Sequence, residues 1–389
     1  MTRVNKMVTV GFIIAPLLSL YATNILSFSF FDIFLLLLTI IVLFHTHSIK
    51  INRPLFRYGI MIVVFHILTL LAGNTEIAST TLRMLRYLFY ILFLAFFSTS
   101  NFEAEYGERV YRFISMASAV FLFAQQIVYS LTGHYIPGFL TFLPLLREEL
   151  MWHAMNYQNR FLLDPRPRSF FSEPQIFASF VLGYLAILLF KNYWDKKDKI
   201  VLIILSLAVL LSRSTTAIIC LVFLWGMFVV HRFHNNKINP SILILLVLAF
   251  VALVFIAPDL YSSRLSLTSH SFTGRMDSYS NFFNEDSSLF KILFGNGMID
   301  IDNSSLSNYT AFIPSLLRFY KYYGVLGCFI VVTVFLGFLR RVMPQYKHLL
   351  YLEMLLLVGT VDFYGVMIFT SLPFVIANEN NDNLNVGVK

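Results

Sequence analysis

The sequence predicts an all-α integral membrane protein, a polytopic bundle of 11 or 12 transmembrane helices forming a single membrane domain over residues 1–389. Hydrophobic residues make up 58% of the chain and charged residues only 13%, which is more apolar surface than a soluble core needs. Apolar runs of about 18 residues or more recur along it, long enough to cross a bilayer as helices. Basic residues lie mainly between these runs, so the net charge of +8 indicates membrane orientation and not nucleic-acid binding.

The first half of the chain divides into six predicted spans, near 7–23, 25–44, 55–72, 80–99, 110–131 and 174–190. Lysine and arginine are enriched in cytoplasmic loops of membrane proteins. Loop 45–57, with Lys50, Arg53 and Arg57, is therefore predicted to lie inside, together with the N-terminus. Counting spans from there places segment 132–173 outside, as a large loop.

The run 200–230 is too long for one simple span and short for two. Lysines precede it and Arg232 follows it, so both flanks are predicted inside, and the run must cross twice or re-enter. Its predicted break is Ser212–Thr216, where an arginine separates two apolar halves. A span near 241–257 then leads into a second large outside loop, 258–312.

Two apolar regions close the chain. A span is predicted at about 322–339, and segment 313–321 either extends it outward or lies at the membrane interface. The last run, 348–376, is either one tilted helix or two short ones. The span count therefore stays at 11 or 12, and the side of the C-terminus stays open.

The outer loop 132–173 carries charge that orientation does not require. It holds no lysine, but it has four arginines: Arg147, Arg160, Arg166 and Arg168. A guanidinium binds a carboxylate or phosphate through two parallel hydrogen bonds, whereas an ammonium acts as a point charge. For Arg147 and Arg160 we expect pairing with acids of the same loop. For Arg168, at the mouth of the next span, we predict ligand binding.

Glu173 follows Arg168 closely and precedes Pro174, which suits the first position of a helix. Two roles are open for Glu173. It either caps the helix, where the dipole would stabilise its carboxylate, or acts as a general base facing the mouth of a cavity. A capping geometry would lower its basicity, so the two roles exclude one another in part.

Other charged residues lie within apolar runs. Arg213, in the break of the run 200–230, is either a functional intramembrane charge or part of a short outside turn at the headgroups. Arg83 and Arg86 share one face near the outer end of the fourth span, where they either snorkel to headgroups or point at a phosphate. Three acids are either ion-paired within the bundle or serve a proton-coupled transporter: Asp32, Glu353 and Asp362.

The second outer loop contains His270 and Arg275, a base and a cation in one short stretch. A lone loop histidine is more often simply solvated. The sequence has no metal-ligand spacing, phosphate loop or dinucleotide fingerprint, so neither a metal nor an organic cofactor is expected.

In their order along the chain, these features resemble the Wzy-type O-antigen polymerases, within the polymerase and ligase superfamily of bacterial surface polysaccharides. The resemblance covers about residues 80–340. It rests on Arg168-Ser-Phe-Phe-Ser-Glu173-Pro174 entering a helix, the break at Ser212-Arg213-Ser214, Gly274-Arg275, Leu293-Phe294-Gly295-Asn296-Gly297 and Tyr323-Gly324-Val325-Leu326-Gly327. The first two elements are moderately specific, and the others gain weight from their order.

The resemblance implies a GT-C-like fold and a metal-independent glycosyltransferase of the bacterial inner membrane, with its active site facing the periplasm. The donor would be a glycan on undecaprenyl diphosphate, and the acceptor a hydroxyl of another lipid-linked repeat unit. Diphosphate binding carries over to Arg168, Arg213 and Arg275. Arg83 and Arg86 are further candidates for this role from their place near the outer surface.

One departure from the superfamily pattern concerns the catalytic base. Ligases carry a His-Asn pair shortly before the glycine of the late span, where this chain has Ile313-Pro314. That difference favours a polymerase over a ligase and leaves the base open, with Glu173 first and His270 second. A flippase for lipid-linked oligosaccharides is the alternative from another class. The residues also leave open whether a chain-length regulator binds.

Overall fold

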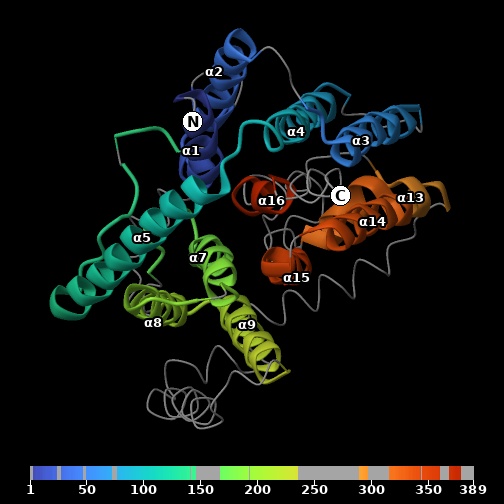
Figure 1. Ribbon diagram of the computed structural model, residues 1–389. Coiled ribbons are helices and arrows are strands. Elements are labelled where there is room, and N and C mark those ends of the chain that lie inside the picture. Colours follow the sequence, from blue (N-terminus) through green and yellow to red (C-terminus); the bar gives the residue numbers. More distant parts are fainter. Residues whose placement is uncertain are drawn as a thin grey trace.

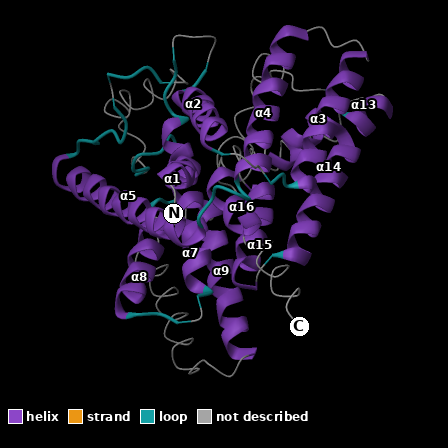
Figure 2. Cartoon of the chain, turned by 45° about the horizontal axis from the view of Figure 1, so that its top comes forward, coloured by secondary structure: helices purple, strands orange, loops and turns teal. Residues whose placement is uncertain are grey.

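The computed structural model of the chain is an all-α bundle (Figures 1 and 2). It describes residues 3–23, 28–46, 50–71, 77–140, 142–145, 167–191, 193–234, 289–296, 315–342, 344–359 and 368–377. Within these ranges the chain forms helices and turns, with two isolated β-bridges beside Tyr21 and Ala22. The predicted fold class is therefore confirmed as an apolar helical bundle.

The described helices include five that are long and apolar enough to cross a membrane, within α3, α4, α5, α9 and α14. Shorter apolar helices, α2 and α7, lie beside them. The bounds are α1 (Arg3–Leu18), α2 (Phe30–His45), α3 (Arg53–Leu71), α4 (Ile77–Phe97), α5 (Ala104–Thr132), α7 (Pro174–Leu189), α8 (Lys196–Leu211), α9 (Thr215–His234), α13 (Leu289–Phe294), α14 (Ser315–Arg341), α15 (Pro344–Gly359) and α16 (Ile368–Ala377). The predicted span 241–257 lies outside the described residues.

One end of the bundle gathers basic residues from several helix ends. Arg112, early in α5, and Lys191, just after α7, both pair with Asp198 at the start of α8, at 2.8 and 3.3 Å. Arg232, near the end of α9, donates a hydrogen bond of 3.1 Å to the Lys191 carbonyl. We call this the basic end. The starts of α5 and α8 and the ends of α7 and α9 meet there, as the predicted alternation of spans requires.

The run 200–230 folds as two helices, α8 and α9, which leave the basic end and return to it. The break lies at Ser212–Ser214, as predicted. The amide and hydroxyl of Ser212 donate to carbonyls of the preceding turn, which ends α8. Arg213 then takes the left-handed conformation (φ 53°) that lets the chain turn into α9. Two helices joined by a turn fit both predicted alternatives, a double crossing and a re-entrant pair.

The last run likewise forms two helices. Tyr346, in the first turn of α15, donates a hydrogen bond of 2.9 Å to Glu108 of α5, so α15 starts at the basic end. Phe374 of α16 packs against Phe102 and Tyr346, with ring centroids 4.9 and 6.1 Å apart. Helix α16 therefore runs back toward the end where α15 began.

Helix α2 begins later than the predicted span 25–44. Ser29 and Asp32 form a capping box, in which each side chain accepts a hydrogen bond from the other residue's backbone amide. This exchange satisfies amides at the helix start and fixes it at Phe30. The apolar run alone extends the predicted span too far, because Ile25, Leu26 and Phe28 continue it upstream of the capping box.

Helix α14 is interrupted at Gly324, whose φ of 64° is not helical. Segment 315–323 is therefore a helical piece that a kink separates from the rest of α14, which fits both predicted alternatives for it. Short α13 packs at this break, and Asn296 beyond it donates a hydrogen bond of 2.7 Å to the Lys321 carbonyl. A Cβ on Gly295 would overlap the backbone at Tyr322, and one on Gly324 would overlap the backbone at Leu293. The two glycine motifs thus meet backbone to backbone.

Candidate functional site at the end opposite the basic end

The end of the bundle opposite the basic end is covered by segment 133–145, which follows α5. Its Leu140 amide bonds to the Tyr21 hydroxyl at 3.0 Å, and its Pro144 carbonyl accepts from the Ala22 amide at 2.9 Å. Leu20, Phe139 and Leu145 form a small apolar cluster beneath it. Segment 133–145 therefore joins the α1–α2 connection to the segment that leads into α7.

Gln125 and Ser169 fix the segment leading into α7. The Gln125 side chain accepts from the Ser169 amide and donates to the Ile136 carbonyl, each at 2.8 Å. The Ser169 hydroxyl donates to the Ser118 carbonyl at 2.7 Å. Ser169 is fully buried with a φ of 55°, and Gly138 packs directly on its carbonyl, where a Cβ would overlap it. A left-handed serine held this tightly indicates a segment positioned by its surroundings.

Arg168 lies in this fixed segment and is only 6% exposed. Its Nη1 donates to the Ser172 carbonyl at 2.8 Å, and its guanidinium lies over the Phe139 ring at 5.1 Å. Nε and Nη2 are buried and have no hydrogen-bond partner among the described residues. Nearly all buried polar groups in proteins have such a partner. Two buried donors on a cation therefore point to an anion as the missing partner, in line with the predicted role of Arg168.

Glu173 occupies the N-cap position of α7, and Pro174 is its first residue, as the sequence predicts. The Glu173 side chain, however, makes no capping hydrogen bond to the helix. Glu173 thus has the predicted N-cap position, and its carboxylate is half-buried at the entrance of α7, five residues after Arg168. The role of Glu173 as a base stays a prediction.

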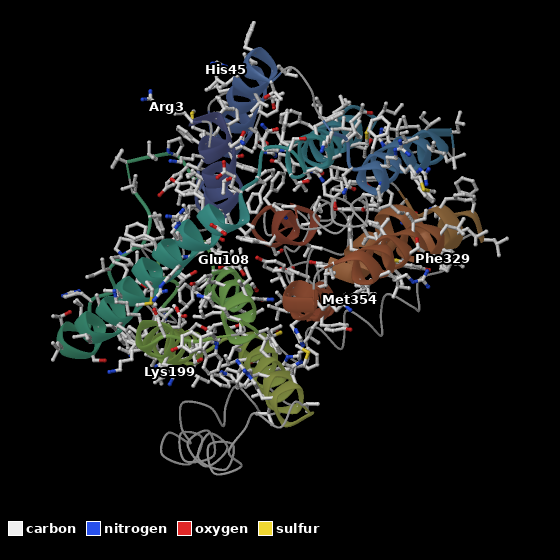
Figure 3. The ribbon with its side chains drawn as sticks, in the orientation of Figure 1. Arg3, His45, Glu108, Lys199, Phe329 and Met354 are labelled. Atoms are coloured by element: carbon white, nitrogen blue, oxygen red, sulfur yellow. The ribbon has the colours of Figure 1, made fainter. Side chains whose placement is uncertain are left out.

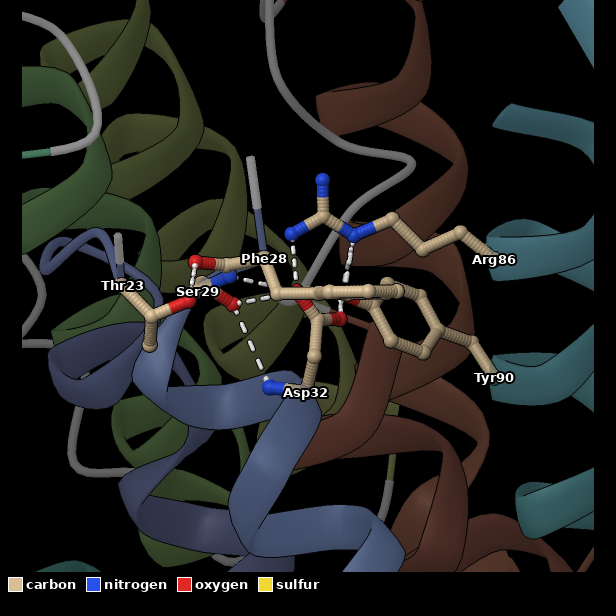
Figure 4. Close-up of polar contacts among 6 residues, drawn as sticks. All are labelled: Thr23, Phe28, Ser29, Asp32, Arg86 and Tyr90. Atoms are coloured by element: carbon tan, nitrogen blue, oxygen red, sulfur yellow. Dashed lines mark hydrogen bonds and ion pairs between the residues drawn. The ribbon is translucent and has the colours of Figure 1, made fainter. Parts of the chain in front are cut away.

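Asp32, Arg86 and Tyr90 form a second charged cluster (Figure 4). Arg86 binds both carboxylate oxygens of Asp32, and the Tyr90 hydroxyl donates to Oδ1 of the same group. Ser29 donates from its amide and hydroxyl to Oδ2, at 2.7 and 2.9 Å. The third nitrogen of the Arg86 guanidinium points away from the carboxylate in Figure 4.

This cluster bears on the alternatives predicted for Asp32 and for Arg86. Asp32 is ion-paired within the bundle, which confirms that alternative for this acid. Arg86 has a protein carboxylate on its bidentate face, where the sequence suggested headgroups or a phosphate. Asp32 is set in place by the capping box of α2, and Arg86 reaches it from α4, 54 positions away in the sequence. Arg83, one turn earlier on α4, is half-buried.

Arg213 lies at the turn between α8 and α9, and only 9% of it is exposed. The predicted turn is therefore present, and its arginine is buried. Because α8 starts and α9 ends at the basic end, this turn belongs to the same end of the bundle as Arg168.

Glu353 is the second acid within the bundle, 6% exposed in the middle of α15. Its Oε2 has no hydrogen-bond partner in the described part of the chain. Its side chain is hydrogen-bonded to Ser371 of α16, and Tyr111 and Cys220 lie near it. No ion pair of Glu353 is found among the described residues, unlike Asp32 and Asp198.

Several predicted residues lie outside the described ranges and stay predictions: His270, Arg275, Asp362, Arg147, Arg160 and Arg166. Among the residues that are described, no three histidine, cysteine or acidic side chains are grouped so as to hold a metal ion. Sequence reasoning missed Gln125 and Tyr90. The available signals were an amide inside an apolar helix and a tyrosine one turn after Arg86.

No protein-family model matches the chain, and no curated protein matches it. Any functional proposal therefore has to rest on the geometry of these residues and on the resemblance of their motifs.

Proposed function

We propose that the chain is a metal-independent glycosyltransferase of the O-antigen polymerase type, which joins undecaprenyl-diphosphate-linked repeat units at the periplasmic face of a bacterial inner membrane. The observation that supports it is Arg168, a buried cation with two donor nitrogens that no described residue satisfies. A buried charge without a counter-charge is costly, and a ligand that brings negative charge removes the cost. A diphosphate is such a ligand.

The sidedness of the proposal follows from the distribution of charge. Loops rich in lysine and arginine stay in the cytoplasm, so the basic end is assigned to that side. Arg168, Arg213 and Glu173 then belong to the periplasmic side, where the resemblance also expects the active site.

In the proposed reaction, an acceptor hydroxyl attacks the anomeric carbon of the donor glycan from the face opposite the diphosphate. The new carbon–oxygen bond forms as the bond to the diphosphate breaks, and the anomeric centre is inverted. Arg168 stabilises the negative charge that develops on the departing diphosphate. Glu173, whose carboxylate is not used for capping, accepts the proton of the acceptor hydroxyl. Arg213 and Arg275 are assigned to the diphosphate through the resemblance.

The proposal is tested by complementing a deletion strain with Arg168→Ala. We expect long-chain polysaccharide to fall by roughly 100-fold or more, because loss of one charge-stabilising group costs that much. The chain-length ladder on a gel and the amount of protein in the membrane are both measured. Arg232→Ala is the control, since it removes a half-buried arginine at the basic end and should leave the ladder intact. A normal ladder from Arg168→Ala would overturn the assignment.

The deletion strain itself separates the proposal from its alternatives. Loss of a polymerase leaves a single repeat unit on the lipid anchor, loss of a ligase leaves none, and loss of a flippase traps repeat units inside the cell. Glu353 is the observation that favours a transporter, because an unpaired buried acid suits proton coupling. If Glu353→Gln traps repeat units inside the cell while Arg168→Ala does not affect chain length, the proposed function is transport and not polymerisation.

A further inference from the structure

A groove of about 240 Å³ runs between α3 and α14 on the outside of the bundle. Both helices are long and apolar enough to cross a membrane. Arg57, Tyr58 and Met61 line the groove from α3, and Ile330, Val334 and Gly337 line it from α14. Phe329, next to the groove, is 66% exposed on the outer side of α14 (Figure 3). The groove therefore opens toward the position of membrane lipid.

Gly337 makes room in this groove. A Cβ built on Gly337 would have no atom within 4 Å, so the space beside it is open. The wall is mainly apolar, with Thr333 among its lining residues. Such a wall with an open strip matches a flexible hydrocarbon chain, which adapts its shape to a shallow groove. Water there would find few polar partners, so hydrocarbon is the better occupant.

The groove is charged at one end only. Helix α3 starts and α14 ends at the basic end, because the Asn52 amide bonds to α4 near its end and α15 starts there directly after α14. Arg57 lines the groove, and Arg53 at the start of α3 and Arg340 near the end of α14 are further exposed arginines at this end. Guanidinium groups at the headgroup level bind phosphate well, and basic pockets between transmembrane helices bind anionic headgroups.

We propose that this groove is a binding site for an anionic glycerophospholipid, with an acyl chain along Met61 and Val334 beside Gly337 and the phosphate at Arg57. The charge pattern selects an anionic lipid over a zwitterionic one, since the second charge of a zwitterionic headgroup would face the same arginines. The site lies away from Arg168 and does not depend on the proposed glycosyltransferase activity.

The test is native mass spectrometry of the purified full-length protein, mixed with equal amounts of phosphatidylglycerol and phosphatidylcholine. We expect phosphatidylglycerol to be retained preferentially. Arg57→Ala should lower its retention about fivefold, the effect of one arginine near a membrane surface. Gly337→Leu should lower retention of both lipids by filling the groove.

Gly226→Leu is the control for Gly337→Leu, because Gly226 in α9 also has open space around it but does not line the groove. Gel filtration and circular dichroism show whether each variant is folded. Equal retention of the two lipids by the parent protein would overturn the charged half of the site. Unchanged retention in both Arg57→Ala and a folded Gly337→Leu would overturn the site itself.

Discussion

Arg86 and Arg168 lie at the same end of one bundle, yet the protein treats their charges differently. Arg86 is matched by Asp32 and Tyr90, and its side chain is still 29% exposed. Arg168 is more deeply buried, and among the described residues its partners are a backbone carbonyl and an aromatic ring. Burial of a charge alone therefore does not tell whether an arginine is structural or, as proposed for Arg168, binds a ligand. The distinction lies in whether the fold supplies the counter-charge.

The fold fixes the position of Arg168, but no described residue provides a counter-charge for its guanidinium. Ser169 next to it is held by two hydrogen bonds and by the close approach of Gly138. The Asp32–Arg86 cluster needs no such frame, because its own hydrogen bonds hold it together. A site prepared for a ligand is expected to be rigid and unsatisfied at once.

The largest effect should come from removing the counter-charge of Arg86. Asp32→Ala leaves a half-buried guanidinium unpaired and also destroys the capping box of α2, which together should cost about 3 kcal/mol of unfolding free energy. Denaturation in detergent measures this loss. The double variant Asp32→Leu with Arg86→Met should recover most of it, because neither charge is then left alone. Failure of the double variant to recover stability would mean that Arg86 has a role beyond this pair.

The next effect concerns the frame around Arg168. Gly138→Ala places a methyl group on the Ser169 carbonyl, so the segment must shift, at a cost of about 2 kcal/mol. Polysaccharide length should fall as well, because Arg168 moves with Ser169. Gly226→Ala, where the added methyl meets nothing, is the control for both measurements. An unchanged ladder in Gly138→Ala would show that the position of Arg168 is not critical.

The smallest expected effect is a gain in the free energy of unfolding, whereas the two variants above lose stability. Arg168→Met replaces an unsatisfied buried cation with an apolar side chain, which should raise the unfolding free energy by about 1 kcal/mol while polymer length is lost. The same denaturation assay measures it beside the Asp32 variants. A clear loss of stability in Arg168→Met would make Arg168 a structural residue like Arg86, and the contrast between the two would disappear.

Local patterns predict much of this fold. Apolar run length locates the helices, and the serine–arginine interruption marks the turn between α8 and α9. The proline after Glu173 marks the start of α7. What the patterns do not encode is contact between distant segments. Nothing near Asp32 indicates Arg86, and nothing near Ser169 indicates Gln125, because such pairs form only when the helices pack. The late start of α2 is a different case, since its Ser29–Asp32 capping signal lies inside an apolar run that hides it.

The meeting of Gly295 with the break at Gly324 has a consequence for how mutations there combine. Each glycine has a positive φ, and this requirement is separate at the two positions. The absence of a side chain at both positions, however, permits one and the same backbone contact. Alanine at either position should force α13 and α14 apart. Once one alanine has separated them, a second alanine at the other glycine meets no further overlap. We expect the double variant to lose less stability than the sum of the single variants. Two motifs far apart in the sequence would then show epistasis, and each would tolerate change best in the background of the other.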